Sequence, residues 1–343
     1  MDDRRRLGST LLIAFIFPGQ GSQKVGMGRA LADAYPEARA AFDEADAALA
    51  ESESGDASTH NETPVRESGQ HLTLTRLIFE GPEDQLVLTQ NAQPAILTVS
   101  IAAYRVLAAR GIEPAFVAGH SLGEYSANVA AETLEFADAV RTVRRRGQYM
   151  QEAVPVGAGS MAAILGLDAD TVTRACEEAA DGEIVSPANI NGAGQVVIAG
   201  TAAAVRRAGE RAKALGARRV IPLAVSAPFH CALLKPAEQR LEPQLRALRV
   251  RDPRVPVVAN VDAEPKRDAA SAIDALVKQV SAPVRWEQVV RRLASEGVTN
   301  YVEVGPGTVL SGLVKKIHKE AVVCNFAAPE DLAAVQETLA RHA

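Results

Sequence analysis

The sequence has few cysteines, no excess of positive charge and no long apolar run, and each shortage excludes a class of protein. Cys176, Cys231 and Cys324 are the only cysteines among 343 residues. An odd number of cysteines at such wide spacing is typical of neither a disulfide framework nor a metal site. The net charge of −5 gives no general affinity for nucleic acid or anionic lipid. No stretch of the sequence is long and apolar enough to span a membrane. A cytoplasmic location, in a reducing compartment, is therefore expected.

The N-terminal segment combines positive charge with a short apolar run, but it is not interpreted as a signal peptide. The run at 11–17, LLIAFIF, passes directly into PGQGSQ without a small-residue cleavage site. Continuous apolar runs of this length are typical of strands that are buried on both faces of a sheet. We therefore expect a first buried strand here, and residues 1–9 are interpreted as a tail.

Strand-like and helix-like segments alternate along most of the chain. This alternation predicts an α/β fold with a parallel sheet and helices on both of its faces. The expected strands lie at 11–17, 114–119, 255–261 and 299–307. The expected helices lie at about 30–50, from Pro94 onward, at 121–131, at 134–152, at 270–280, and in one final helix after 307.

The pattern changes between residues 156 and 225. Here the segments follow the order β-α-β-β-α-β, which is typical of a small ferredoxin-like unit. We therefore expect two domains, a discontinuous large α/β domain made of 1–155 and 226–343, and an inserted ferredoxin-like domain at 156–225. The segment at 51–72 is polar and rich in Ser and Glu, and it is interpreted as a solvated insertion.

Residues 119–123, GHSLG, place a serine between two glycines where a strand-like run becomes a helix-like run. In α/β-hydrolase-like folds, G-x-S-x-G forms a sharp turn that exposes the serine hydroxyl and directs the following backbone N–H at the same point. Both glycines are needed because a Cβ on either side would collide within so tight a turn. Ser121 is therefore a candidate nucleophile in an α/β-hydrolase-like large domain, and an ordinary turn serine is the alternative.

A serine nucleophile needs a base, and the chain has six histidines. Two of them lie in the polar insertion, two lie in the C-terminal region, and His120 is expected to point away from the turn. His230, in VSAPFHC, follows an apolar run and precedes a helix, in the kind of strand-end loop where catalytic groups are common. His230 is the candidate base, and a core histidine that caps the helix is the alternative.

One arginine falls on the apolar side of the helix expected at 134–152. Arg146 follows Val143 by three residues and Ala139 by seven, so it shares their buried side. Arg144 and Arg145 are expected to point elsewhere and to be solvated. A buried guanidinium needs an anionic partner, and an internal Asp or Glu would serve as well as a bound carboxylate.

Eight segments, in one order and across nearly the whole chain, resemble a known family. They are FIFPGQGSQ (15–23), TQNAQPAIL (89–97), GHSLGEYSA (119–127), RRGQYMQEAVP (145–155), ANINGAGQVVIAG (188–200), SAPFHCALLKP (226–236), PVRW (283–286) and EVGPGTVLSGL (303–313). These segments are similar to those of the malonyl-CoA:acyl carrier protein transacylases of fatty acid synthesis. The polar insertion is the main departure from the family, and it avoids every one of these segments.

The resemblance implies a reaction and roles for five residues. Ser121 would carry the malonyl group as an ester, and His230 would act as general base and then as acid. Arg146 would bind the malonyl carboxylate with its planar fork. The backbone N–H groups of Gln20 and Leu122 would form the oxyanion hole. The implied activity is a ping-pong transfer of malonyl from malonyl-CoA to the phosphopantetheine thiol of acyl carrier protein.

The resemblance also implies the surroundings of these groups. Gln93 and Phe229 would line the acyl site, where an aromatic side chain leaves little room for an α-methyl branch. A backbone carbonyl close to Arg285 would orient the histidine. No metal and no cofactor are expected. The partners are malonyl-CoA and an acidic acyl carrier protein that docks on a basic patch, with Lys315 and Lys316 of the last helix as candidates. The chain is expected to be a monomer.

Three other functions share part of this pattern. A thioesterase or esterase would need a catalytic aspartate, for which Asp138 and Asp168 are candidates. A non-catalytic carrier-binding protein would keep the fold, but it has no need of the serine, the histidine and the arginine together. An acyltransferase for methylmalonyl or another extender would differ only in its acyl pocket.

Overall fold

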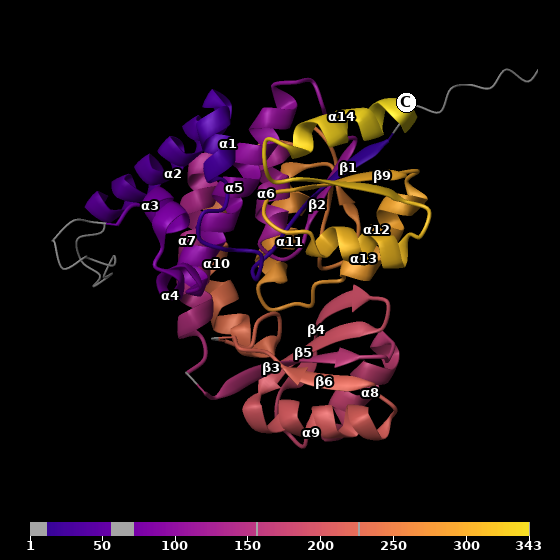
Figure 1. Ribbon diagram of the computed structural model, residues 1–343. Helices are drawn as coiled ribbons and strands as arrows, with labels where there is room; N and C mark the ends of the chain where they lie inside the picture. Colours follow the sequence, from indigo (N-terminus) through magenta and orange to yellow (C-terminus); the bar gives the residue numbers. More distant parts are fainter. Residues whose placement is uncertain (1–11, 56–71, 156, 226, 343) are drawn as a thin grey trace, which may run out of the picture.

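The strands of this chain form two separate sheets. The structure is a computed structural model that describes residues 12–55, 72–155, 157–225 and 227–342. The expected tail at 1–9 and most of the polar insertion at 51–72 lie outside the described residues. A six-stranded sheet lies above a four-stranded one in Figure 1, and the chain passes from the upper to the lower part and back.

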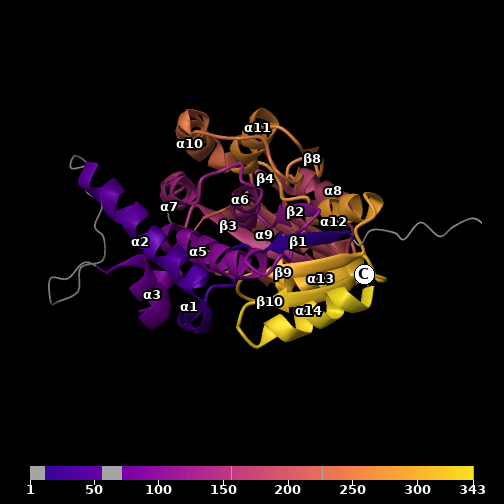
Figure 2. The same ribbon diagram turned by 90° about the horizontal axis from the view of Figure 1, so that it is seen from above.

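The six-stranded sheet is almost entirely parallel. Its order is β10-β9-β1-β2-β7-β8, and only β8 pairs antiparallel with its neighbour. Figure 2 shows β10, β9, β1, β2 and β8 in this order from bottom to top. The expected α/β fold is therefore confirmed. The strands are β1 (Ile13–Phe17), β2 (Phe116–Gly119), β7 (Val257–Val258), β8 (Pro265–Lys266), β9 (Asn300–Val304) and β10 (Val322–Phe326).

Helices cover both faces of this sheet. Figure 2 shows α5 and α6 on one side of the strands, and α12 and α13 on the other. The helices of this part are α1 (Arg29–Ala34), α2 (Pro36–Gly55), α3 (Leu74–Glu80), α4 (Glu83–Leu86), α5 (Thr89–Ala108), α6 (Gly123–Ala130), α7 (Phe136–Glu152), α10 (Lys235–Ala247), α11 (Ala269–Gln279), α12 (Trp286–Ser295), α13 (Val309–Ile317) and α14 (Asp331–His342).

Strand β1 shows why its apolar run is continuous. Side chains of a strand point alternately to opposite faces of the sheet. Phe15 and Phe17 pack into the core that contains α2, α5 and α7, whereas Ala14 and Ile16 pack into a second core beneath α12 and α13. All four side chains are fully buried, as expected for a strand with a helical layer on each side.

Two helices differ from the sequence-based expectation because of proline. The helix expected at about 30–50 is divided at Tyr35, which is extended, with φ −132 and ψ 120, because the residue before a proline disfavours the helical region. The helix expected from Pro94 begins five residues earlier, at Thr89. Pro94 lies inside it and lacks the N–H that would bond to the Gln90 carbonyl, and that carbonyl instead accepts from Arg144 at 3.3 Å.

The C-terminal region contains more than the single final helix that was expected. Helix α13 is followed by strand β10, which pairs with β9, and then by α14. Lys315 and Lys316 therefore lie on α13 and not on the last helix of the chain.

The four-stranded sheet is antiparallel and has the order β4-β5-β3-β6. With helices α8 and α9 on one face, this arrangement confirms the ferredoxin-like prediction. The division of the chain into two domains at 156 and 225 stays an interpretation. The elements are β3 (Gly159–Leu165), α8 (Ala169–Ala179), β4 (Val185–Gly192), β5 (Gln195–Thr201), α9 (Ala202–Ala214) and β6 (Arg219–Pro222).

The second face of the four-stranded sheet packs against the segment that precedes α10. Met161 and Ala163 of β3 pack there with Phe229, Cys231 and Leu233. Phe229 and Cys231 lie just before the one-turn helix η1 (Ala232–Leu234), which contains Leu233 and leads into α10. The small sheet thus lies directly against the segment that contains His230. No helix of the described residues is long and apolar enough to cross a membrane.

Candidate active site

Ser121 lies in the tight turn between β2 and α6. Its φ is +51, in the left-handed region that is costly for a residue with a side chain. A Cβ on Gly119 would lie 1.9 Å from the Gly123 carbonyl carbon, and one on Gly123 would lie 2.0 Å from the Phe17 carbonyl oxygen. Only glycine fits at either position, which confirms the reason given for the G-x-S-x-G pattern.

Two amide side chains hold the backbone of this turn. Asn260 Oδ1 accepts from the Ser121 N–H at 2.8 Å, and Asn260 Nδ2 donates to the Gly119 carbonyl at 2.7 Å. Gln279 Nε2 donates to the Ser121 carbonyl at 2.8 Å. These bonds satisfy the polar groups on both sides of the serine.

The Ser121 hydroxyl lies against the imidazole of His230. The distance from Ser121 Oγ to His230 Nε2 is 2.7 Å, and His230 Nδ1 lies 2.9 Å from the main-chain oxygen of Gln279. Since a carbonyl only accepts, Nδ1 carries the proton in the neutral ring and Nε2 is left as the acceptor for the serine O–H. This arrangement suits a general base.

Burial keeps His230 neutral. Desolvation, followed by the charge of Arg146, lowers the pKa of His230 to about 3, against the opposing hydrogen bond to Gln279. His230 is therefore unprotonated at neutral pH and able to accept a proton.

The carbonyl that orients His230 is not the one expected near Arg285. It belongs to Gln279, the last residue of α11. The final carbonyls of a helix lack intrahelical partners, and the residue four positions on, Pro283, has no N–H to donate. Arg285 instead donates its N–H to the Asn260 carbonyl at 3.0 Å. The prediction for Arg285 was therefore wrong.

Arg146 is buried and points at the serine. Its side chain is 1% exposed, and Nη2 lies 3.3 Å from Ser121 Oγ. Nη1 donates to Gln93 Oε1 at 2.7 Å, and Nη2 donates to Gln279 Oε1 at 2.9 Å. Its Nε has no hydrogen-bond partner among the described residues. Among the described residues, no carboxylate lies within 4.0 Å of this guanidinium, so the alternative of a direct internal salt bridge is not met.

The neighbouring arginines differ from the expectation that both are solvated. Arg144 is half-buried and donates to the carbonyl of Gln90 and to Asn91 Oδ1. Arg145 is also half-buried and lies 3.4 Å from Gln244 Oε1. The reason is that α5 and α10 both pack against α7, so only part of the polar side of α7 faces solvent.

The two N–H groups expected to form an oxyanion hole come from two different segments of the chain. Gln20 belongs to the loop after β1, and Leu122 follows Ser121 at the start of α6. Neither N–H donates to a protein acceptor within the described part of the chain. The loop approaches the turn closely, since a Cβ on Gly19 would lie 2.5 Å from the His120 carbonyl oxygen.

One cavity of about 520 Å³ brings most of the candidate residues together. The candidates that line it are Gln20, Gln93, Ser121, Arg146, Phe229 and His230. Leu122, which is buried, and Arg285 are not part of its lining. The wall is completed by Met161 and Asn189 of the small sheet and by Leu223, which follows β6. The groups expected to act on one substrate therefore face one space of suitable size.

The aspartates that a hydrolase would use have other contacts. Asp138 pairs with Arg141 at 2.7 Å. Asp168 caps α8 by accepting from the Thr171 N–H. His230 has a main-chain carbonyl in the place where an aspartate would lie, so neither aspartate completes a triad. No group of three metal-ligating side chains is found in the described ranges.

Sequence reasoning missed three polar residues behind the serine. Gln279, Asn260 and Glu124 are all buried and hydrogen-bonded to one another. The only available signal was a polar residue within an apolar run, as in VVANV for Asn260.

Comparison with known proteins finds one family throughout. The model of the acyl transferase domain matches residues 14–335. The chain is 47% identical over 95% of its length, and 97% of the relative, to the malonyl CoA-acyl carrier protein transacylase of Bacillus subtilis. It is equally identical, over 94% of its length and 98% of the relative, to that of Escherichia coli.

Solved structures agree with this result. An acyl carrier protein S-malonyltransferase from Vibrio cholerae is 44% identical with a TM-score of 0.86, covering 94% of this chain and 99% of that one. A malonyl-transacylase solved in complex with its type II PKS acyl-carrier protein is 43% identical, also with a TM-score of 0.86, covering 95% of this chain and 99% of that one.

Proposed function

This chain belongs to the acyl transferase family, among the malonyl CoA-acyl carrier protein transacylases, and we propose that Ser121, His230 and Arg146 carry out its malonyl transfer. It is an acyl carrier protein S-malonyltransferase, with malonyl-CoA and acyl carrier protein as its substrates. The observation that carries the assignment of residues is the 2.7 Å contact between Ser121 Oγ and His230 Nε2, beside a buried guanidinium that no carboxylate of the described residues neutralises directly.

The first half of the reaction acylates the serine. The malonyl carboxylate binds Arg146, which brings the thioester carbonyl to Ser121. Ser121 Oγ attacks the carbonyl carbon while His230 Nε2 takes the hydroxyl proton. The tetrahedral oxyanion accepts hydrogen bonds from the N–H groups of Gln20 and Leu122. The C–S bond then breaks, and His230 returns the proton to the CoA sulfur.

The second half reverses these steps with a new thiol. After CoA leaves, the phosphopantetheine thiol of the carrier enters the same cavity and gives its proton to His230 Nε2. The thiolate attacks the malonyl ester, the C–O bond to Ser121 breaks, and the proton passes to Ser121 Oγ. This sequence gives ping-pong kinetics.

Arg146 is suited to binding the substrate carboxylate. Its partners are the neutral amides of Gln93 and Gln279, so its fork is held in place without being occupied by an acid. Phe229 borders the same cavity, and we propose that it limits the room for an α-methyl branch.

The carrier protein carries acidic charge, and we propose that it docks near α13. Lys316 borders a second cavity of about 440 Å³ between the small sheet and α12 and α13, together with Arg218 and Arg291. Lys315 lies next to it on α13. The same lining contains Asp168 and Glu287, and Glu287 pairs with Arg291 at 2.5 Å. Arg218 and the two lysines are therefore the charges that would steer an acidic partner toward the boundary between the two sheets.

The wider setting of the reaction is also proposed. The transferred malonyl units supply chain elongation in fatty acid synthesis, by a monomer in the cytoplasm. The three cysteines are free thiols, which agrees with a reducing compartment.

Labelling with malonyl-CoA tests this function. The purified protein is incubated with malonyl-CoA, and its intact mass and peptide masses are measured. We expect one malonyl group, located on Ser121, that disappears when phosphopantetheinylated acyl carrier protein is added. Parallel incubations with acetyl-CoA and methylmalonyl-CoA measure selectivity. A label on any other residue would refute the assignment of the nucleophile.

A further inference from the structure

Glu124 is a buried carboxylate three residues after the nucleophile. Its side chain is 1% exposed. Its Oε2 accepts from Gln279 Nε2 at 2.8 Å and from the Asn260 main-chain N–H at 2.9 Å. Among the described residues, no lysine or arginine lies within 4.0 Å of it. A buried carboxylate without a direct counter-ion is costly, and the reactions described above give it no role.

The two groups that Glu124 binds are the ones that hold the serine turn. Asn260 accepts from the Ser121 N–H, and Gln279 donates to the Ser121 carbonyl. The main-chain oxygen of Gln279 also faces His230 Nδ1. Glu124 is therefore linked to the serine turn through Asn260 and Gln279, and to the base through Gln279.

Gln279 also connects Glu124 to Arg146. Its Oε1 accepts from Arg146 Nη2 at 2.9 Å, while its Nε2 donates to Glu124 Oε2 at 2.8 Å. A guanidinium only donates and an ionised carboxylate only accepts. These two ions therefore fix which end of the Gln279 amide faces which neighbour, and the amide lies between them as the bridge of an ion pair.

We propose that Glu124 is a positioning residue that holds Gln279 and Asn260 against the serine turn and acts, through the Gln279 amide, as the counter-charge of Arg146. This inference rests on the function proposed above. A direct salt bridge would occupy the arginine fork that the substrate carboxylate needs. A bridge through an amide balances the buried charge and leaves the fork accessible.

The bridge has a consequence for substrate binding. A malonyl carboxylate on Arg146 adds a second negative charge to the same buried surroundings, and like charges disfavour each other's ionised forms. Binding of the substrate carboxylate should therefore draw a proton onto Glu124. Both N–H bonds end on Oε2, so Oε1 can take this proton while both bonds remain.

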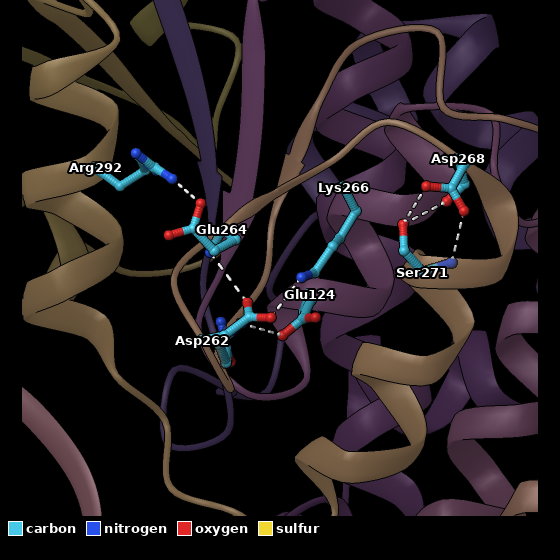
Figure 3. Close-up of polar contacts among 8 residues, drawn as sticks. Glu124, Asp262, Glu264, Lys266, Asp268, Ser271 and Arg292 are labelled. Atoms are coloured by element: carbon cyan, nitrogen blue, oxygen red, sulfur yellow. Dashed lines mark hydrogen bonds and ion pairs between the residues drawn. The ribbon is translucent and has the colours of Figure 1, made fainter.

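Burial places this proton exchange near neutral pH. Burial raises the pKa of Glu124 to about 7, the N–H groups of Asn260 and Gln279 oppose the rise, and Asp262 adds to it while Arg146 lowers it. Asp262 is itself paired with Lys266 at 2.5 Å, and Figure 3 shows both beside Glu124.

His230, the histidine of this cavity that contacts Ser121, has its pKa lowered to about 3. Burial also lowers the pKa of His120, the other histidine that lines this cavity. Both histidines therefore stay neutral near pH 7, and Glu124 is the group whose protonation the substrate carboxylate changes in that range.

Calorimetry of malonyl-CoA binding tests the inference. The Ser121→Ala variant binds without reacting, and titrations in two buffers of different ionisation enthalpy report the protons taken up. We expect uptake of about half a proton per site at pH 7, because a group of this pKa is half-protonated beforehand. CoA, which lacks the carboxylate, should cause no uptake. In the double variant Ser121→Ala, Glu124→Gln we expect none with malonyl-CoA either.

A matched control comes from a second buried carboxylate. Glu303 accepts from the N–H groups of Leu310 and Ser311, and burial raises the pKa of its carboxyl, but it does not line the cavity that contains Ser121. Adding Glu303→Gln to Ser121→Ala should leave the proton uptake unchanged.

Two results would overturn the inference. One is the absence of proton uptake when Ser121→Ala binds malonyl-CoA, which needs no change at Glu124 and so does not depend on whether Glu124→Gln folds. The other is the same uptake in the double variant. If the unmodified protein forms the malonyl-serine ester while uptake is absent, this inference fails and the proposed function stands. If the ester does not form, the function itself fails.

Discussion

The six-stranded sheet has helices on both faces, whereas the four-stranded sheet has helices on one face and the His230 segment on the other. The two sheets also contribute different kinds of group to the cavity. Ser121, Arg146 and Gln279 come from elements packed on the large sheet, and each has hydrogen-bond partners that are themselves buried. The side of the small sheet contributes two apolar side chains, Met161 of β3 and Leu223 just after β6, and one amide, Asn189 of β4.

This difference indicates that the two sides of the cavity have different roles. Groups that must be held to a fraction of an ångström are placed where the surroundings are packed and polar atoms are satisfied. A wall that only has to exclude water and shape the acyl site can be built with fewer directional contacts. Substitutions on the large-sheet side should therefore affect chemistry far more than those on the small-sheet side.

The largest effect is expected for Ser121→Ala. Removing the nucleophile should lower kcat by on the order of 10⁴-fold or more and abolish the malonyl label in a mass measurement. The fold should be unaffected, because the turn is held through the Ser121 backbone. A variant that still accumulates labelled protein would contradict the assignment.

Arg146→Ala should produce the next largest effect, and a selective one. Loss of a buried partner for the substrate carboxylate should lower kcat/KM for malonyl-CoA by roughly 10²- to 10³-fold, with a much smaller loss for acetyl-CoA. Steady-state kinetics with both substrates measure the ratio. Equal losses on the two substrates would mean that Arg146 is only structural.

The pH dependence gives a third comparison. Burial and Arg146 lower the pKa of His230 to about 3 from its usual 6.5, so the base stays unprotonated well below pH 6.5. The acid limb of kcat/KM for acylation should therefore lie well below that value. Because the unfolded chain binds a proton that the folded one does not, stability should also fall as the pH drops from 6.5 toward 3. Stability in urea at each pH separates the two effects.

The smallest effect is expected on the side of the small sheet. Asn191 Oδ1 of β4 lies 3.0 Å from Nε2 of His120, the residue before the nucleophile. Asn191→Ala removes one hydrogen bond between the two sheets and should lower kcat/KM by about tenfold or less. A loss as large as that of Arg146→Ala would erase the proposed difference between the two sides.

The sequence was informative where local rules decide. The G-x-S-x-G pattern predicted the turn at Ser121, because the steric demand on Gly119 and Gly123 is local. Helical periodicity predicted that Arg146 is buried, because its position on the apolar side of α7 depends only on spacing.

The contacts that complete the site depend on tertiary packing, and the sequence did not reveal them. Gln279 is 49 residues from His230 and 133 from Arg146 along the chain, and no local pattern connects them. The expectation for Arg285 failed for the same reason. The carbonyl that faces His230 belongs to Gln279, and it is available because α11 ends there and Pro283 has no N–H to donate to it. The break at Tyr35 follows from a local rule, because the residue before a proline disfavours the helical region. The continuation of α5 through Pro94 was less predictable, because it depends on Arg144, which donates to the carbonyl that Pro94 leaves without an N–H partner.

The fate of the isolated malonyl-enzyme shows whether Ser121 stores the malonyl group for a carrier thiol or loses it to water. The ester is formed with malonyl-CoA, freed of excess substrate, and followed by mass with and without phosphopantetheinylated acyl carrier protein. We predict that the ester on Ser121 persists in buffer and that its malonyl group moves to the carrier thiol when the carrier is added. Loss of the ester to water at the same rate in both samples would contradict it, because the protein would then be a hydrolase.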